Sequence, residues 1–185
     1  MNDQNDSYEM GSARFKKYLS EAEIRIITQN LAEQIRKDYQ GKTVLLIGVL
    51  KGAFVFMADL MRELKMDVEI DFVRLSSYGK GKQSSGTVTL LKDISRDIRG
   101  KHVIIVEEII DSGRSLKFLR DRLIQSEPDS LEIVTLLDKA EKRLVDVPVK
   151  YVGRKVEDHF LIGYGLDLEE CARNFSDILS LSYPN

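Results

Sequence analysis

The chain has 185 residues, of which 43% are hydrophobic and 31% are charged, a composition typical of a globular protein with one domain. The formal net charge of -2 argues against a general nucleic-acid-binding surface, and no apolar run approaches the length that spans a membrane. Cys171 is the single cysteine, which excludes an intrachain disulfide and, with a polar N-terminus that lacks a signal-peptide core, favours the reducing cytoplasm. Residues 1–12 are polar, and we expect them to be flexible.

A capping box marks the start of the first predicted helix. Ser20 and Glu23 have the spacing at which each side chain bonds to the backbone N–H group of the other. The apolar residues that follow recur on one helical face, at Ile24, Ile27, Leu31 and Ile35. We expect this helix to end near residues 39–41.

An apolar strand is expected over residues 43–49, and it ends in a short polar loop. The loop contains Lys51 and Gly52, and a helix should follow over about residues 53–64. Taken alone, Lys51 is a solvated lysine beside a glycine that starts a helix. Its place at the carboxyl end of a strand makes it a candidate for ligand binding.

The next strand leads into a long polar segment. Alternating residues predict a strand over residues 67–75, after which Ser77 and Tyr78 belong to a segment rich in Gly, Ser and Lys that runs to residue 86. A loop of this length in a compact domain is usually functional or disordered. A plain hairpin tip is the alternative.

Residues 103–116 carry the most informative pattern in the chain. Their first four residues form a β-branched run, which is typical of a strand buried on both faces of a parallel sheet. Glu107, Glu108 and Asp111 follow, and residues 112–115 (Ser-Gly-Arg-Ser) lead into a helix that starts around the last serine. Backbone N–H groups at a helix start can cradle a phosphate, while the acids suit ribose hydroxyls or a divalent cation. A loop that only caps a helix is the alternative.

Two further strands are expected in the second half of the chain. A strand over residues 131–137 ends in Asp138 and Lys139. A short strand is expected over residues 147–152, where Pro148 indicates an edge position. Lys139 alone would be a surface charge, but its place at the end of a strand makes it a candidate for binding.

Residues 103–116 resemble the phosphoribosyl-pyrophosphate signature of the type I phosphoribosyltransferases. In that signature, apolar residues precede Glu-Asp, two apolar residues and Asp-Thr-Gly-x-Thr. Glu108 stands where Asp is commoner, and Ser112 and Ser115 stand where Thr is commoner, so the charge and the hydroxyl groups are kept. Glu108 is one methylene longer than Asp, which changes its reach.

Other segments resemble, in family order, parts of the family members that act on 6-oxopurines. Residues 50–52 (Leu-Lys-Gly) are similar to a loop that contacts pyrophosphate, in which the peptide before the lysine can be cis. Residues 77–78 (Ser-Tyr) are similar to part of a mobile catalytic lid. Residues 160–167 with Arg173 are similar to the segment that holds the base, although residues 156–159 (Val-Glu-Asp-His) depart from the usual Ile-Pro-Asp-Lys.

The resemblance implies a fold and a reaction. The fold is α/β, with a mostly parallel sheet flanked by helices, in a single phosphoribosyltransferase domain over residues 1–185 with a small hood subdomain from N- and C-terminal segments. The reaction transfers the 5-phosphoribosyl group from phosphoribosyl pyrophosphate to hypoxanthine or guanine, with Mg²⁺ as cofactor, giving IMP or GMP and pyrophosphate. The resemblance also implies a homodimer or homotetramer that acts on small molecules and binds neither nucleic acid nor a membrane.

The resemblance further implies a role for each candidate residue. Asp111 would be the general base that takes a proton from the purine. Phosphoribosyl pyrophosphate would be bound by Lys51, Gly52, Glu107, Glu108, Asp111, Ser112, Gly113, Arg114, Ser115 and Arg173. The purine would be bound by Lys139, Phe160, Leu161 and Asp167, and Mg²⁺ by Asp167, Glu107 and Glu108. Ser77 and Tyr78 would close over the site as a lid.

Two other functions remain open at this point. The first is a regulator on the same fold that senses nucleotides and binds RNA, with Lys80, Lys82 and Lys101 as its basic candidates. RNA binding with steep salt dependence, and no turnover of a purine, would distinguish it. The second is an enzyme of the same reaction class that uses xanthine or a pyrimidine. Preference among hypoxanthine, guanine and xanthine is not readable from residue identity, because we expect the contact at purine C2 to come from the main chain.

Overall fold

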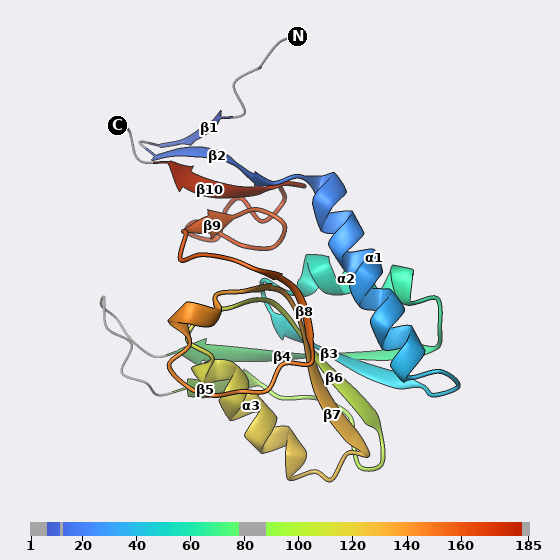
Figure 1. The fold of residues 1–185 in the computed structure, drawn as a ribbon. Coiled ribbons are helices and arrows are strands. Elements are labelled where there is room, and N and C mark those ends of the chain that lie inside the picture. The colour runs from blue at the N-terminus through green and yellow to red at the C-terminus, as the bar shows by residue number, and fades with distance from the viewer. Residues whose placement is uncertain (1–6, 12, 78–87, 183–185) are drawn as a thin grey trace.

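The computed structural model describes residues 7–11, 13–77 and 88–182, and its main feature is a six-stranded sheet (Figure 1). The strands of this sheet are β3 (Val44–Leu50), β4 (Val68–Ser77), β5 (Val88–Lys92), β6 (His102–Ile110), β7 (Ser130–Asp138) and β8 (Tyr151–Lys155). They lie in the order β5–β4–β3–β6–β7–β8, and only the β4–β5 pair within it is antiparallel. The predicted α/β fold with a mostly parallel sheet is confirmed.

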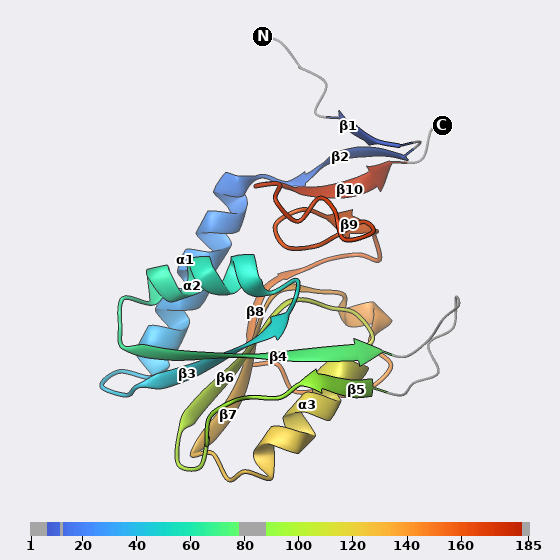
Figure 2. The ribbon, with the colours of Figure 1, turned by 180° about the vertical axis from the view of Figure 1, so that it is seen from behind.

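Helices cover both faces of the sheet. α1 (Glu21–Asp38) and α2 (Phe54–Leu64) pack on one face, and α3 (Arg114–Ile124) packs on the other (Figure 1, Figure 2). α1 and α2 begin and end, and α3 begins, within two residues of the predicted positions. Within the ranges that the structure describes, no helix combines the length and the apolar character needed to cross a membrane.

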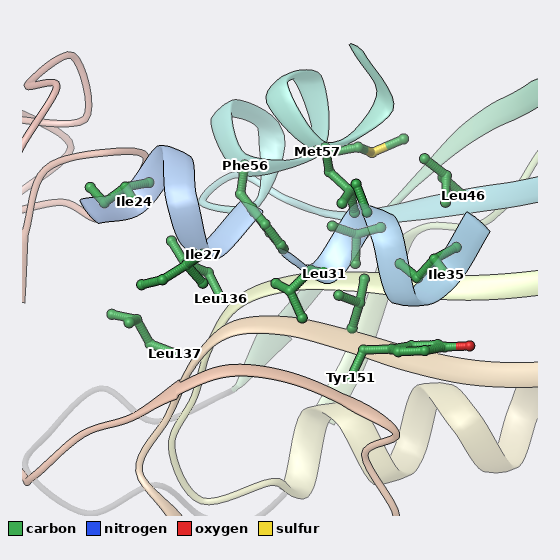
Figure 3. Close-up of a cluster of buried hydrophobic side chains, with 14 of the residues drawn as sticks. Ile24, Ile27, Leu31, Ile35, Leu46, Phe56, Met57, Leu136, Leu137 and Tyr151 are labelled. Carbon is green, nitrogen blue, oxygen red and sulfur yellow. The ribbon is translucent and has the colours of Figure 1, made fainter. Parts of the chain in front are cut away.

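Alternation along the strands explains why both faces are covered. Leu46 and Ile104 belong to the core beneath α1 and α2, whereas Leu45 and Ile105 belong to the core beneath α3. Burial of one such side chain contributes about 1.5–3 kcal/mol. Figure 3 shows the first of these cores, in which Ile24, Ile27, Leu31 and Ile35 of α1 lie among side chains of α2 and the sheet. The labelled partners are Phe56 and Met57 of α2, Leu46 of β3, Leu136 and Leu137 of β7, and Tyr151 of β8.

Two strands differ in extent from the prediction. β6 continues to Ile110, so Glu107 and Glu108 lie inside the strand and not after it. The reason is that main-chain pairing with β7 continues through these residues, and a ladder of backbone hydrogen bonds does not require apolar side chains. β8 begins at Tyr151, after Pro148, because proline has no N–H group to donate to a ladder. The predicted edge position is confirmed.

A second sheet of four antiparallel strands forms the hood, on the α1 and α2 side of the main sheet (Figure 1). Its order is β1 (Ser7–Met10), β2 (Ala13–Leu19), β10 (Ile178–Ser182) and β9 (Leu161–Ile162). Phe15, Ile162 and Leu179 are buried within it. The predicted hood from both ends of the chain is therefore observed. The residues of β1 pair with β2, and residues 1–6 and 12 lie outside the described residues, so the expected flexibility of residues 1–12 stays a prediction.

We expect Ser20→Ala to lower the free energy of unfolding by about 0.5–2 kcal/mol while leaving the fold intact. The Ser20 side chain accepts the Glu23 N–H group at 3.3 Å, and the Glu23 carboxylate accepts the Ser20 N–H group at 2.9 Å. Alanine removes the first of these acceptors, so a backbone donor in the first turn of α1 loses its partner. Urea unfolding followed by circular dichroism measures the change, and an unchanged midpoint would contradict the capping role.

Candidate active site

The order of the strands places two loops side by side. From β3 the chain continues to β4 on one side, whereas β6 leads to β7 on the other side, so the strand order reverses between β3 and β6. Ligands of open α/β sheets bind at such a switch point, outside the carboxyl ends of the strands. Lys51 and Gly52 follow β3, and Glu108 and Asp111 lie at the carboxyl end of β6. The Leu50–Lys51 peptide bond is cis.

Gly52 lies where three segments meet. A Cβ atom on Gly52 would lie 1.7 Å from Oε1 of Glu108, so the Glu108 carboxylate occupies the space where any larger residue at position 52 would place its side chain. A Cβ atom on Gly165 would lie 2.1 Å from the Gly52 carbonyl oxygen. The loop after β3, the end of β6 and the segment after β9 are therefore in direct contact.

Arg173 holds the segment after β9 together. Its guanidinium group donates to the Gly165 carbonyl oxygen at 2.7 Å and lies 2.9 Å from Oδ1 of Asp167. It also lies 3.2 Å from Oε2 of Glu170, and the same oxygen accepts a hydrogen bond from Lys51 Nζ at 2.8 Å. Lys51, and then Arg173, lower the pKa of Glu170. Glu170 thus connects the loop after β3 to Arg173.

Two buried atoms near this junction have no hydrogen-bonding partner. Among the side chains that the structure describes, these atoms are Oε2 of Glu108 and Nε of Arg173. Such atoms are rare in proteins, because burying a polar group without a partner costs about 1–3 kcal/mol. One is an acceptor and the other is a donor. A polar ligand could supply the hydrogen-bonding partners that this acceptor and this donor lack.

The two acids at the end of β6, Glu107 and Glu108, have raised pKa values. Burial raises the pKa of Glu107 well above its ordinary value, and the adjacent Glu108 carboxylate raises it further. Burial also raises the pKa of Glu108, with a contribution from Asp167, while Glu107 and Arg173 act in the opposite direction. Two crowded carboxylates of this kind suit a partner that brings hydroxyl donors or a cation.

The loop between β6 and α3 lines a cavity of about 220 Å³. Polar side chains and backbone in its wall come from Glu107, Asp111, Ser112, Gly113 and Ser115. α3 begins at Arg114, and no side chain caps its first backbone N–H groups. These donors, with the partial positive charge of a helix N-terminus, are suited to a phosphate group.

Lys139 belongs to a charged cluster at the same edge of the sheet. Its Nζ donates to Oδ1 of Asp158 at 3.0 Å, and only 9% of its side chain is exposed. Lys142, in the short turn η1 (Ala140–Lys142), donates to the same oxygen at 2.8 Å. Lys142 Nζ is also 3.5 Å from Oδ2 of Asp111. The structure therefore brings Lys139 and Asp111 together through Lys142 and Asp158.

The remaining predicted residues lie farther out. Phe160 follows Asp158 by two residues, and its side chain is 49% exposed, whereas Leu161 is buried in β9. Phe160 is therefore near the Lys139 cluster because only one residue separates it from Asp158 along the chain. Ser77 ends β4, at the same carboxyl edge, and Tyr78 lies outside the described residues.

Sequence reasoning missed three charged residues of this region: Lys142, Asp158 and Glu170. Each lies in a polar turn, where a charged side chain is usually a solvated one. Glu170 had a detectable signal, because it lies three residues after Asp167 and three before Arg173. Lys142 and Asp158 are far apart along the chain and come together only on folding.

Two acids of the described residues, Glu108 and Asp167, are candidates for holding a metal ion. The described residues contain no group of three or more His, Cys, Asp or Glu side chains that could hold one. Mg²⁺ usually binds one or two carboxylates and completes its coordination with water and substrate phosphates. Glu108, with its unpartnered buried oxygen, and Asp167, close enough to raise the Glu108 pKa, fit that mode of binding.

A second cavity, of about 530 Å³, lies between α1, α2 and residues 174–176. Tyr164 and Arg173 contribute to its wall, together with apolar residues of both helices. It is not lined by the acids of β6 or by the loop before α3. The chemistry of phosphates and hydroxyls is therefore expected in the smaller cavity, at the strand ends.

Known proteins resemble this chain in sequence and in fold. Residues 16–169 match the family model of the phosphoribosyl transferase domain, and the chain belongs to that family. It is similar to the hypoxanthine-guanine phosphoribosyltransferase of Staphylococcus aureus strain Mu50, with 44% identity over 163 residues, covering 88% of this chain and 91% of that protein. The enzyme of that name from Streptococcus mutans is 49% identical over 155 residues, covering 84% and 86%. A crystal structure of a Staphylococcus aureus hypoxanthine phosphoribosyltransferase superimposes with a TM-score of 0.87 at 41% identity, covering 98% of this chain and 96% of that one.

Proposed function

We propose that this protein is a purine salvage enzyme that transfers the 5-phosphoribosyl group from phosphoribosyl pyrophosphate to a 6-oxopurine, hypoxanthine or guanine. The products are IMP or GMP and pyrophosphate. The observation that carries the proposal is the junction at Gly52. There a buried acceptor of Glu108 and a buried donor of Arg173 both lack a hydrogen-bonding partner. The names of the Staphylococcus aureus and Streptococcus mutans relatives support the choice of purine.

Lys51, the backbone at Gly52 and Arg173 would stabilise the leaving pyrophosphate. Negative charge collects on this group as its bond to ribose C1 breaks. The Gly165 carbonyl oxygen and Asp167 fix the Arg173 guanidinium group, and its Nε is the donor that remains for substrate. Preorganised donors at the site of developing charge usually make the largest single contribution to catalysis.

Glu107 and Glu108 would accept hydrogen bonds from the ribose hydroxyls. The 5-phosphate would bind to residues 111–115, where the first N–H groups of α3 have no side-chain cap. The hydroxyl groups of Ser112 and Ser115 would donate to the same phosphate. This arrangement holds both ends of the ribose phosphate while C1 reacts, which reduces the entropic part of the barrier.

The purine side of the site would use the Lys139 cluster. Lys139 Nζ, held by Asp158, would donate to the 6-oxo oxygen. The Phe160 ring would stack on the base, and the backbone at Leu161 would contact the base edge. Asp111 would take the proton from N7 as N9 of the base attacks C1, so that the proton moves to the carboxylate, the new bond forms between N9 and C1, and the bond from C1 to pyrophosphate breaks.

Mg²⁺ is part of the proposal. Asp167 and Glu108 would hold it, and Glu107, which the sequence adds to this set, is not needed, because Mg²⁺ usually takes one or two protein carboxylates and the described residues form no group of three acids that could hold a metal. When bound, the ion supplies positive charge beside the phosphate oxygens. The chain itself supplies the oxygens that receive it.

The lid is also a proposal. Ser77 ends β4 at the carboxyl edge of the sheet, the edge at which the site lies, and Tyr78 follows it outside the described residues. The lid residues beyond Ser77 lie outside the described part of the chain, so their role in excluding water stays a prediction.

The assembly and location of the enzyme are proposals of the same kind. We propose a homodimer or homotetramer that works in the cytoplasm. The single cysteine, Cys171, is unpaired, which agrees with a reducing compartment. Light scattering on the purified protein would measure the assembly.

A product assay tests the proposed function. The protein is incubated with phosphoribosyl pyrophosphate, Mg²⁺ and one base at a time, from hypoxanthine, guanine, xanthine, adenine and uracil, and the monophosphate is detected by liquid chromatography. Formation of IMP or GMP supports the proposal. Turnover of uracil alone, or of no base, contradicts it, and the second result combined with salt-dependent RNA binding would favour a regulator.

We expect Lys139→Ala to reduce the preference for hypoxanthine over adenine by about 10- to 100-fold, the equivalent of one hydrogen bond from a charged donor. The reason is that an ammonium group can donate to a 6-oxo oxygen and cannot accept from a 6-amino group. The measured quantity is the ratio of kcat/KM for the two bases. An equal ratio in the variant and the wild type would remove Lys139 from base recognition.

A further inference from the structure

Lys142 lies between two carboxylates on the purine side of the site. Its Nζ is 2.8 Å from Oδ1 of Asp158 and 3.5 Å from Oδ2 of Asp111. Asp111 follows the last residue of β6, whereas Asp158 lies between β8 and β9. One ammonium group therefore connects two segments that belong to different parts of the chain.

Lys139 is tied into the same cluster at both its side chain and its backbone. Its Nζ shares Oδ1 of Asp158 with Lys142, at 3.0 Å and 2.8 Å respectively. Its N–H group donates to the carbonyl oxygen of Ile110, the residue before Asp111, at 2.9 Å. Its own carbonyl oxygen accepts the Lys142 N–H group at 2.9 Å. Lys142 thus contacts both Lys139 and Asp111, by its backbone on one side and its side chain on the other.

We infer that Lys142 is a positioning residue that aligns the general base Asp111 with the purine-binding Lys139, an inference that rests on the function proposed above. The 6-oxo oxygen and N7 lie on the same edge of the purine. The group that holds the oxygen and the group that takes the N7 proton must therefore keep a fixed separation. Lys142 sets this separation, because its ion pairs join Asp111 to the carboxylate that holds Lys139.

The surrounding charges suit this role. Asp158 raises the pKa of Lys142, and Asp111 adds to the effect, so Lys142 carries a positive charge at neutral pH. The neighbouring Arg143 is engaged elsewhere, with Nη2 at 2.9 Å from Oδ1 of Asp138. Within the described cluster, Lys142 pairs with both Asp111 and Asp158, whereas Lys139 pairs with Asp158.

The test replaces Lys142 by methionine, which keeps the length of the side chain and removes its charge. Single-turnover measurements are used because product release can limit kcat. For Lys142→Met with hypoxanthine, we expect a single-turnover rate constant about tenfold lower than that of the wild type. The KM for phosphoribosyl pyrophosphate should stay within about twofold of the wild-type value. Lys142→Arg, which keeps the positive charge, should recover the rate constant. A purely structural role would not separate the two constants in this way. Thermal unfolding verifies that the variants are folded.

Lys150→Met is the matched control. Lys150 Nζ lies 2.8 Å from Oδ2 of Asp38, and its side chain is 43% exposed, against 44% for Lys142. Lys150 directly precedes β8 and so lies at the amino ends of the parallel strands, whereas the site lies at their carboxyl ends. Its variant should therefore have the wild-type rate constant.

Three results would overturn the inference. If Lys142→Met has both the wild-type rate constant and the wild-type KM, Lys142 positions nothing that the reaction needs. If instead the rate constant is unchanged and the KM for phosphoribosyl pyrophosphate rises, Lys142 binds the phosphates. If the wild-type protein forms no monophosphate, the proposed function is wrong, and so is this inference, which depends on it. This result is distinct from the other two.

Discussion

Asp111→Asn should lower the rate of nucleotide formation by about 10²–10⁴-fold, the usual contribution of a general base. Asparagine keeps the shape of the side chain but cannot take the proton from purine N7. The affinity for phosphoribosyl pyrophosphate should change far less, because the phosphate cradle uses the backbone N–H groups at the start of α3. Single-turnover kinetics measure the rate, and isothermal titration calorimetry measures the affinity.

Asp121→Asn provides the control for this variant. Asp111 and Asp121 each face a lysine, at 3.5 Å and 2.7 Å, and each side chain is 50% exposed. Asp121 lies within α3 and has no role in the proposed reaction, so its variant should keep the wild-type rate. A wild-type rate in Asp111→Asn as well would exclude Asp111 as the base.

Gly165→Ala should have the second large effect, on both activity and stability. Its Cβ atom would lie 2.1 Å from the Gly52 carbonyl oxygen, and backbone atoms on both sides leave little room to adjust. Gly165 also has a φ of +98°, a backbone angle that residues other than glycine rarely adopt. We expect the free energy of unfolding to fall by about 1–3 kcal/mol. We expect kcat/KM for phosphoribosyl pyrophosphate to fall by about 100-fold, because the Gly52 loop moves away from Arg173.

Gly41→Ala separates the two causes. Gly41 also has a positive φ, +74°, but no atom lies within 4 Å of the position that its Cβ would take. This variant should lose some stability through backbone strain and keep its kcat/KM. Urea unfolding and steady-state kinetics on both variants make the comparison. If Gly165→Ala retains wild-type kcat/KM, close contact between the two loops is not needed for the reaction.

The parts of the fold that could be predicted are those with a local cause. β3 and β6 contain runs of buried aliphatic residues, and the capping box at Ser20 fixes the start of α1. Polar residues that directly follow such runs, such as Lys51 and Asp111, lie at the carboxyl edge of the sheet for the same reason. The location of the site follows from the pattern of strand, loop and helix alone.

The parts that could not be predicted depend on contacts between distant segments. β9 has two residues, and its place in the hood depends on pairing with β10. The packing of Glu108 against Gly52 brings together two separate strand ends, and nothing in either sequence segment specifies it. Lys142 has the local pattern of a solvated turn. Its contact with Asp111 exists only because η1 folds back on the end of β6.

A crystal structure of the protein with phosphoribosyl pyrophosphate and Mg²⁺ tests most directly whether the loops at the strand ends form one substrate site. We expect to find pyrophosphate at the Gly52 backbone and Arg173, and the 5-phosphate at residues 111–115. Density for the substrate in the 530 Å³ cavity between α1 and α2, with the loop before α3 empty, would contradict it.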